Sequence, residues 1–200
     1  DACIPASAQG KAKLLVKEDG IIAGVELAKR IFSHFDKNLK VEVLIKDGSN
    51  IKVGDIILTV EGSSRSILKT ERLVLNFMQR MSGIATKTAA YNKLIEGTSA
   101  KLLDTRKTTP LLRELEKFAV KIGGGVNHRI GLYDMVMIKD NHIDMAGGIQ
   151  QAIERVHQHL KSIGKDLKIE IEVRNFEELN EVLSIGGIHR VMLDNFHPDD

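Results

Sequence analysis

The second half of the chain alternates short apolar runs with longer amphipathic segments, and this pattern constrains the fold more than any other. Short strands that alternate with helices of about ten to fifteen residues build a parallel sheet, which is either open or closed into a barrel. The sequence therefore predicts an α/β fold. The predicted strands are residues 101–104, 134–139, 168–173 and 190–194, and the predicted helices are residues 110–120, 146–161 and 176–184.

Charged residues follow each of these apolar runs. A buried strand can carry a charge only near its end, because removing an unpaired ion from water costs several kcal/mol. An open doubly wound sheet gathers its ligand at one switch point, whereas a (β/α) barrel uses the carboxyl ends of several strands. Four charged ends therefore favour a barrel with one site at its mouth. The ends are Asp104-Thr105-Arg106-Lys107, Lys139-Asp140-Asn141-His142, Glu172 and Asp194-Asn195.

The first part of the chain is predicted to be a small domain of strands followed by a long helix. From Thr70 the apolar period changes from two to about 3.6, which predicts a helix to Ile95 that Gly83 would interrupt. Its buried face should carry Leu73, Phe77, Met81, Ile84 and Thr88. The predicted strands cover residues 13–17, 21–24, 41–45 and 56–60, and a short helix covers residues 28–35.

Composition excludes several classes of protein. The 200 residues carry 29 basic and 27 acidic side chains and only 4% aromatic residues, so the sequence predicts neither a basic nucleic-acid-binding face nor a stacking platform. No apolar run approaches the length of a membrane span. Cys3 is the single cysteine, which rules out an internal disulfide and predicts a reducing compartment, the cytoplasm.

A set of basic residues surrounds the predicted strand ends. Any one of them, taken alone, would be read as a solvated surface charge. Together they would place about five cations at one barrel mouth, where mutual repulsion favours a polyanionic occupant such as a phosphate-rich or dicarboxylate ligand. The set is Arg106, Lys107, His128, Arg129 and Lys139.

Glu172 and Asp194 supply the opposite charge at the ends of two other apolar runs. Glu170 and Glu172 share one face of their strand, so at least one of them should point into the barrel. Two interpretations remain open: these carboxylates pair with the neighbouring bases, or they hold Mg²⁺ together with substrate phosphates. No pattern of acidic and histidine residues predicts a tightly held transition metal.

Three alternative interpretations compete with this site. Lys139 at a barrel strand end could form a Schiff base, as in aldolase-type lyases. Residues 41–60, with a stretch similar to lipoyl and biotinyl carriers, could form a carrier or regulatory module, although no modifiable lysine at a hairpin tip is evident. A dinucleotide fold is rejected, because Gly123-Gly124-Gly125 lacks the preceding strand and the G-x-G-x-x-G spacing.

Longer motifs in the chain resemble the quinolinate phosphoribosyltransferase family, the carboxylating nicotinate-nucleotide pyrophosphorylases of NAD biosynthesis. The resemblance runs in order through essentially the whole chain. Two departures are Leu111, where the family often has Gly, and Phe118 in place of a frequent Tyr, and we expect both to be tolerated packing changes. The matching motifs are Thr70-Glu71-Arg72, Asn76-Phe77, Ser82-Gly83-Ile84-Ala85-Thr86, Leu103-Asp104-Thr105-Arg106-Lys107-Thr108-Thr109-Pro110, Gly123-Gly124-Gly125-Val126-Asn127-His128-Arg129, Ile138-Lys139-Asp140-Asn141-His142, Glu172 and Leu193-Asp194-Asn195-Phe196.

The resemblance implies a type II phosphoribosyltransferase. Residues 1–72 would form an N-terminal open-faced α/β sandwich and residues 73–200 an incomplete α/β barrel, with both ends truncated relative to the family. The implied reaction joins quinolinate to 5-phosphoribosyl 1-pyrophosphate in the presence of Mg²⁺, giving nicotinate mononucleotide, pyrophosphate and CO₂. A relative that acts on nicotinate without decarboxylation would need fewer cations than the basic set provides.

The resemblance also assigns roles to residues. Thr105, Arg106, His128, Arg129 and Lys139 would bind quinolinate, joined by Arg72 of the partner subunit in a homodimer with shared active sites or in a higher assembly of dimers. Lys107 and Lys139 would act on the phosphate side. Glu172 and Asp194 would bind Mg²⁺ or the ribose hydroxyls, with no tight metal site held by the protein alone.

Overall fold

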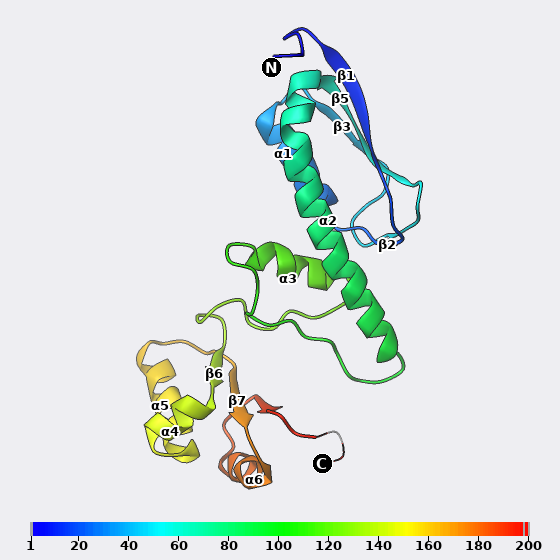
Figure 1. Ribbon diagram of the computed structural model, residues 1–200. Helices are drawn as coiled ribbons and strands as arrows, with labels where there is room; N and C mark the ends of the chain where they lie inside the picture. The colour runs from blue at the N-terminus through cyan, green and yellow to red at the C-terminus, as the bar shows by residue number, and fades with distance from the viewer. Residues whose placement is uncertain (1, 198, 200) are drawn as a thin grey trace. The chain divides into compact units, whose positions relative to one another are not determined.

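The computed structural model describes residues 2–197 and residue 199 of the chain. The chain divides into two compact units, unit 1 (residues 1–128) and unit 2 (residues 129–200) (Figure 1). No helix in the described part of the chain is both long enough and apolar enough to cross a membrane.

Unit 1 is built on a three-stranded antiparallel sheet in the order β1 (Gln9–Leu15), β5 (Ile56–Ser63), β3 (Lys40–Val43). Ala12, Val60 and Val41 lie side by side in register and face the helices. Lys11, Glu61 and Lys40 form the next row, on the opposite and solvated face. The period of two in these strands thus produces one apolar and one charged face, as an open-faced sandwich requires.

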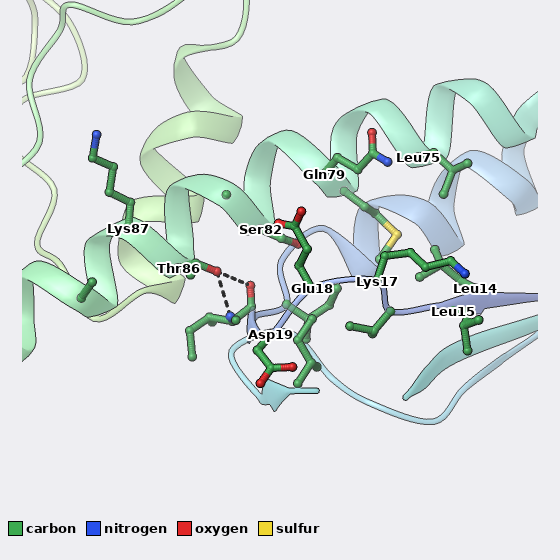
Figure 2. Close-up of a pocket in the computed structure, with 18 residues that line it drawn as sticks. Leu14, Leu15, Lys17, Glu18, Asp19, Leu75, Gln79, Ser82, Thr86 and Lys87 are labelled. Atoms are coloured by element: carbon green, nitrogen blue, oxygen red, sulfur yellow. Dashed lines mark hydrogen bonds between the residues drawn. The ribbon is translucent and has the colours of Figure 1, made fainter. Parts of the chain in front are cut away.

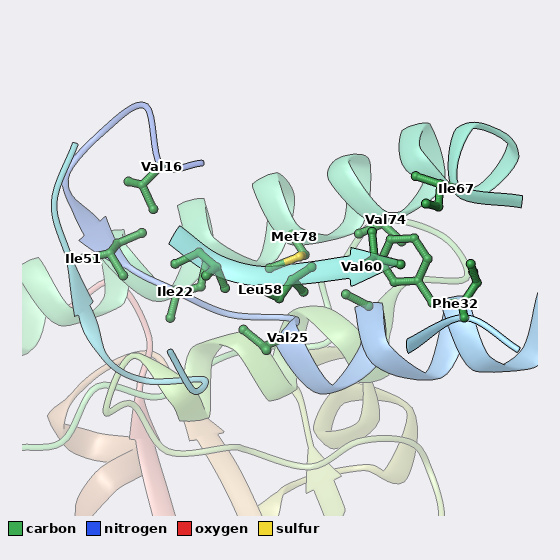
Figure 3. Close-up of a cluster of buried hydrophobic side chains, with 13 residues drawn as sticks. Val16, Ile22, Val25, Phe32, Ile51, Leu58, Val60, Ile67, Val74 and Met78 are labelled. Carbon is green, nitrogen blue, oxygen red and sulfur yellow. The ribbon is translucent and has the colours of Figure 1, made fainter. Parts of the chain in front are cut away.

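Two helices cover the apolar face, α1 (Val25–Phe35) and α2 (Ser64–Leu94). Figure 3 shows Leu58 and Val60 of β5 packed with Phe32, Val74 and Met78 from these helices. A separate two-stranded ladder joins β2 (Gly20–Ile21) to β4 (Asn50–Ile51). The predicted sandwich is therefore confirmed in this unit.

Helix α2 differs from the prediction in three respects. It begins earlier, after Ser63, whose hydroxyl accepts the Ser66 N–H at 3.4 Å as an N-cap. It continues through Gly83, because this residue lies on an exposed side where a glycine weakens a helix without breaking it. Its buried face is centred on Val74, Met78 and Ala85, and Leu73 remains 49% exposed.

The predicted strand at residues 101–104 is wrong. Only an isolated parallel bridge between Leu103 and Val126 is present there. Immediately afterwards the chain turns, because Thr105 Oγ1 accepts the Lys107 N–H at 3.0 Å and the Arg106 carbonyl accepts the Thr108 N–H at 2.9 Å. These local bonds compete with the ladder that a strand would need.

Gly123, at the end of α3 (Arg113–Ile122), packs directly on α2. A Cβ added to Gly123 would lie 2.3 Å from the Ala85 carbonyl oxygen and 2.7 Å from Thr88 Cβ. The glycine is therefore needed where two helices approach closely. This packing explains the glycine at position 123 without a bound phosphate group, which agrees with the rejection of a dinucleotide fold.

Leu111 is not a packing change. Its side chain is fully exposed and its backbone is left-handed, with φ 67°. That conformation costs an L-residue with a Cβ roughly 1–2 kcal/mol, which explains why glycine suits the position. We expect Leu111→Gly to raise the free energy of unfolding by about 0.5–1 kcal/mol, after allowance for the greater freedom of glycine in the unfolded chain. Urea denaturation will test this expectation, with Leu111→Ala as the control that keeps the Cβ and should show no such gain.

Unit 2 contains the predicted parallel sheet, in the order β6 (Val136–Ile138), β7 (Ile169–Val173), β8 (Arg190–Leu193). Helices α5 (Ile149–Ser162) and α6 (Phe176–Ile185) follow β6 and β7 as expected. A short helix, α4 (Asp140–Ala146), was not predicted. Closure into a barrel and a domain boundary after residue 72 stay predictions.

Candidate functional site

The sheet of unit 2 has one apolar and one charged face. Ile138, Ile171 and Val173 pack with residues of α5 and α6 in the core. The alternate residues face the other way, so Lys139 follows Ile138 on β6 and Glu172 follows Ile171 on β7 in the same register. As a result Lys139 Nζ lies 2.7 Å from Glu172 Oε1 at the carboxyl ends of neighbouring strands.

Asp194 lies just beyond the end of β8, near the same edge of the sheet. Met192 pairs with Glu172, and Asp194 comes two residues later, which places both carboxylates on one face by the period of two. The Asp194 N–H donates to the Val173 carbonyl at 2.9 Å, and this bond fixes the backbone there. Asn195 follows in a left-handed conformation with φ 59°, which asparagine tolerates better than most residues.

Arg129 is a buried member of the same charged face. Its Nη2 contacts Met137 Sδ at 3.1 Å, and Met137 pairs with Glu170 across β6 and β7. Glu170 is fully buried, and its Oε2 accepts a bond from Arg190 Nη1 at 3.1 Å. The structure thus brings the predicted Arg129, Lys139 and Glu172 to one face of one sheet.

Glu170 and Arg190 belong to this face but were not predicted as site residues. The signal for Glu170 was its alternation with Glu172 in a strand that is otherwise apolar. Arg190 carries no comparable signal, because it begins a strand, where a charged residue is ordinary.

A backbone hydrogen bond fixes Lys139 in addition to the ion pair of its side chain with Glu172. It is the residue before α4, and its N–H donates to His142 Nδ1 at 3.0 Å. This bond closes a small ring at the start of the helix and fixes the direction in which the lysine side chain leaves the sheet.

The other predicted basic residues lie in unit 1, around the loop of residues 104–109. Arg106 is half-buried and Lys107 is exposed, and neither side chain forms an ion pair within the residues that the structure describes. Arg113 binds this loop through two hydrogen bonds: its Nη2 donates to the Arg106 carbonyl at 3.4 Å, and its Nε donates to Thr108 Oγ1 at 3.3 Å. The loop therefore has a defined backbone with two cationic side chains available.

His128 is tied to the start of the same loop. Its N–H donates to Asp104 Oδ1 at 2.8 Å, beside the bridge between Leu103 and Val126. Thr105, the next residue, accepts the Lys107 N–H through its hydroxyl. Unit 1 thus groups Thr105, Arg106 and Lys107 with His128.

Arg72 lies apart from that group, on the exposed side of α2. Among the described residues its guanidinium has no hydrogen-bond or ion-pair partner. Such an arginine is available to an anion or to another protein chain.

Glu116 of α3 links the loop to α2. It bonds Arg80, with Nε to Oε1 at 2.7 Å, and accepts the Thr109 N–H at 3.1 Å. Its side chain is only 12% exposed, and although burial alone would raise its pKa, the bonds from Arg80 and Thr109 hold the pKa below its ordinary value of 4.5. The carboxylate form therefore stabilises the folded protein.

A lowered pKa predicts how stability depends on pH. The contribution of Glu116 is fully present above its unfolded pKa of 4.5 and is lost as the pH falls through its lower folded pKa. We expect Glu116→Gln to have a lower free energy of unfolding than the wild type at about pH 7. This difference in the free energy of unfolding should become smaller below about pH 4.5. Urea denaturation of both proteins across this range will measure it, and a difference that is constant with pH would contradict the assignment.

A pocket of about 560 Å³ lies elsewhere in unit 1, between residues 14–22 and α2. Figure 2 shows Thr86 of α2 at its wall, where Thr86 Oγ1 accepts the Ile21 N–H at 2.9 Å. Lys17, Glu18, Asp19 and Lys87 contribute charged groups to an otherwise largely apolar lining. None of the predicted site residues lines this pocket.

Metal ligands are few in the structure. Across residues 2–197 and residue 199, no group of three or more His, Cys, Asp or Glu side chains is placed to hold a metal ion. Glu172 and Asp194 together offer two hard oxygen donors on one face of the sheet, a donor set that suits Mg²⁺ when substrate phosphates complete the shell.

Comparison with known proteins decides the family. A model of the N-terminal domain of quinolinate phosphoribosyl transferase matches residues 1–82, and a model of the C-terminal domain matches residues 84–200. The chain belongs to the quinolinate phosphoribosyltransferase family. The resemblance predicted from the sequence motifs is thereby confirmed, and the carrier and lyase interpretations lose their support.

Individual relatives of this phosphoribosyltransferase family agree. The chain is 49% identical to the chloroplastic nicotinate-nucleotide pyrophosphorylase (carboxylating) of Arabidopsis thaliana, over 97% of this chain and 57% of that protein. It is 41% identical to the probable enzyme of the same name from Synechocystis, over 96% of this chain and 63% of that protein. The crystal structure of NadC from Streptococcus pyogenes superposes with a TM-score of 0.91 at 39% identity, covering 100% of this chain and 69% of that one. The chain thus spans less than two thirds of these curated relatives.

Proposed function

We propose that the protein transfers the phosphoribosyl group of 5-phosphoribosyl 1-pyrophosphate to quinolinate, with loss of CO₂, to give nicotinate mononucleotide and pyrophosphate for NAD biosynthesis. The observation that carries the proposal is that the models of both family domains match the chain, one after the other, over residues 1–82 and 84–200. The charged face of unit 2 supports it, because Lys139 and Glu172 stand at adjacent strand ends, where barrel enzymes place their chemistry.

The basic residues would bind the two carboxylates of quinolinate. Arg106 and His128 stand on two segments of unit 1 that Asp104 joins, and Arg129 and Lys139 stand on the charged face of unit 2. Guanidinium groups suit a planar dicarboxylate, because they donate two parallel hydrogen bonds to one carboxylate. Thr105 offers a hydroxyl beside them.

The carboxylates would act on the ribose side. Departure of pyrophosphate leaves an oxocarbenium-like centre, whose positive charge Glu172 and Asp194 would stabilise while the cations hold both anionic substrates in line. Lys107 would neutralise phosphate oxygens. After the bond to the ring nitrogen forms, the C2–carboxylate bond breaks and CO₂ departs. The electron pair stays on C2, stabilised by the adjacent positive nitrogen, and C2 then takes up a proton from water.

Mg²⁺ is the proposed metal. When bound, it supplies charge neutralisation on the pyrophosphate leaving group. Glu172 and Asp194 would hold it together with phosphate oxygens of the substrate.

A homodimer with shared active sites is part of the proposal. Arg72 supports it, because an arginine on the outer side of α2 without a partner inside the described chain can complete a site on a second copy. A cytoplasmic location stays a prediction from the lone cysteine, which is free and exposed.

The decisive experiment measures the release of CO₂ from quinolinate rather than the binding of quinolinate. Full-length protein is incubated with quinolinate labelled at the 2-carboxylate, 5-phosphoribosyl 1-pyrophosphate and Mg²⁺. We expect labelled CO₂ and nicotinate mononucleotide in equal amounts, and neither when any one component is left out. Turnover of nicotinate without turnover of quinolinate would overturn the proposal, as would borohydride-trapped substrate on Lys139.

A further inference from the structure

We propose that the buried ion pair between Asp104 and Lys117 positions the substrate-binding segments of unit 1, the loop of residues 105–107 and His128. The inference rests on the proposed function for the identity of the ligand, a pyridine dicarboxylate. Neither residue is among the predicted site residues. Both would act through their neighbours rather than by touching substrate, so they are positioning residues.

The first argument is burial. The side chain of Lys117 is 2% exposed and that of Asp104 is 6% exposed. Lys117 belongs to α3, two residues before Ala119, which is a member of the small apolar cluster between α3 and α2. Withdrawing two ions from water costs several kcal/mol for each, and a well-packed apolar residue such as Met would serve helix packing at least as well. The pair therefore contributes something beyond packing.

The second argument is connectivity. Asp104 Oδ1 accepts bonds from two groups, Lys117 Nζ and the His128 N–H at 2.8 Å. The Asp104 N–H donates to the Val126 carbonyl at 3.2 Å. One carboxylate thus joins α3 to both segments that carry predicted quinolinate ligands. The next residues after Asp104 are Thr105, Arg106 and Lys107, so a shift of the backbone at Asp104 moves them as well.

The third argument concerns what happens without the pair. Asp104 Oδ2 is buried and has no hydrogen-bond partner among the residues described here. If the charge of Lys117 is removed, a nearly isolated carboxylate remains in an apolar surrounding, and it must turn toward water. That turn breaks the bond to the His128 N–H. The loop itself would persist, because Arg113 and Glu116 still bond it from the other side.

The first test needs no substrate. Amide hydrogen exchange is measured on full-length wild type, Lys117→Met, and the double variant Asp104→Asn with Lys117→Met. We expect the His128 amide to exchange at least about tenfold faster in Lys117→Met, and to recover most of its protection in the double variant, since Asn keeps the acceptor oxygen and buries no charge. Val74→Ala, a core substitution in α2, is the control for general loss of stability.

The second test measures quinolinate binding by calorimetry. We expect binding about tenfold weaker in Lys117→Met, within about threefold of the wild type in the double variant, and within about twofold in Val74→Ala. Equal effects of Lys117→Met and Val74→Ala on exchange at His128 and on binding would overturn the inference, as would a double variant that is worse than Lys117→Met. If the wild type binds no quinolinate, the proposed function fails, and the exchange result alone decides whether the pair positions these segments.

Discussion

Replacing Lys139 by Ala in the full-length protein is expected to lower kcat/KM for quinolinate by at least about a hundredfold, because the proposed charge-assisted bond from Lys139 to a substrate carboxylate is lost. A second effect adds to the first. Lys139 bonds Glu172, whose side chain is only 14% exposed, so the substitution leaves that carboxylate without its nearby cation. Steady-state rates with varied quinolinate will measure the loss.

Unit 2 offers a closely matched control for this substitution. Arg174 and Glu178 form an ion pair at 2.5 Å, with side-chain exposures of 44% and 14%, against 43% and 14% for Lys139 and Glu172. Arg174 follows β7, and its side chain bonds Glu178 of α6 and Asp144 of α4 rather than Glu172 or Lys139. Arg174→Ala should therefore change kcat/KM by less than about threefold. Similar losses in both variants would mean that Lys139 acts through the stability of unit 2 alone.

The strands of unit 2 and its helices α5 and α6 could be predicted because each is locally patterned and bounded by polar residues, whereas the seven-residue α4 was missed. The absence of a strand at residues 101–104 could not be predicted. The local turn at Thr105 and Arg106 ends the extended segment, so that only a single parallel bridge, from Leu103 to Val126, forms. Of the residues predicted for the buried face of α2, Met81 and Thr88 are buried, whereas Leu73, Phe77 and Ile84 each precede a buried residue by one position. Leu73 and Val74 are both apolar, and only the position of the sheet decides which of them is covered.

The site shows the same division between local and distant information. Lys139 and Glu172 could be predicted, because charged residues that end apolar strands leave a visible trace in the sequence. Glu172 pairs with Lys139 in the structure, and its binding of Mg²⁺ together with substrate phosphates stays a prediction. Lys117 could not be predicted, because nothing nearby distinguishes it from the exposed Lys121 on the same helix. Its burial depends on Asp104, thirteen residues away across a turn.

Mixing two inactive variants is expected to restore activity if the active sites are shared between subunits. Arg72→Ala and Lys139→Ala should each lose most activity as homodimers. After random exchange of subunits in equal amounts, half of the dimers contain one of each, and each such dimer has one site with both residues intact. The mixture should recover about a quarter of the wild-type activity, as the two-fold symmetry of a homodimer requires.

The geometry of unit 2 supplies the control for this experiment. Lys139 and Glu172 lie on the same sheet of one subunit, 2.7 Å apart, so no exchange of subunits can reunite them once each is altered in a different copy. A mixture of Lys139→Ala with Glu172→Gln should therefore remain inactive, while the mixture of Arg72→Ala with Lys139→Ala recovers. If the mixture of Arg72→Ala with Lys139→Ala stays inactive although tagged subunits show that exchange took place, Arg72 lies outside the active site of the partner. Recovery in both mixtures would contradict the charged face itself, because its two central residues would then act in different sites.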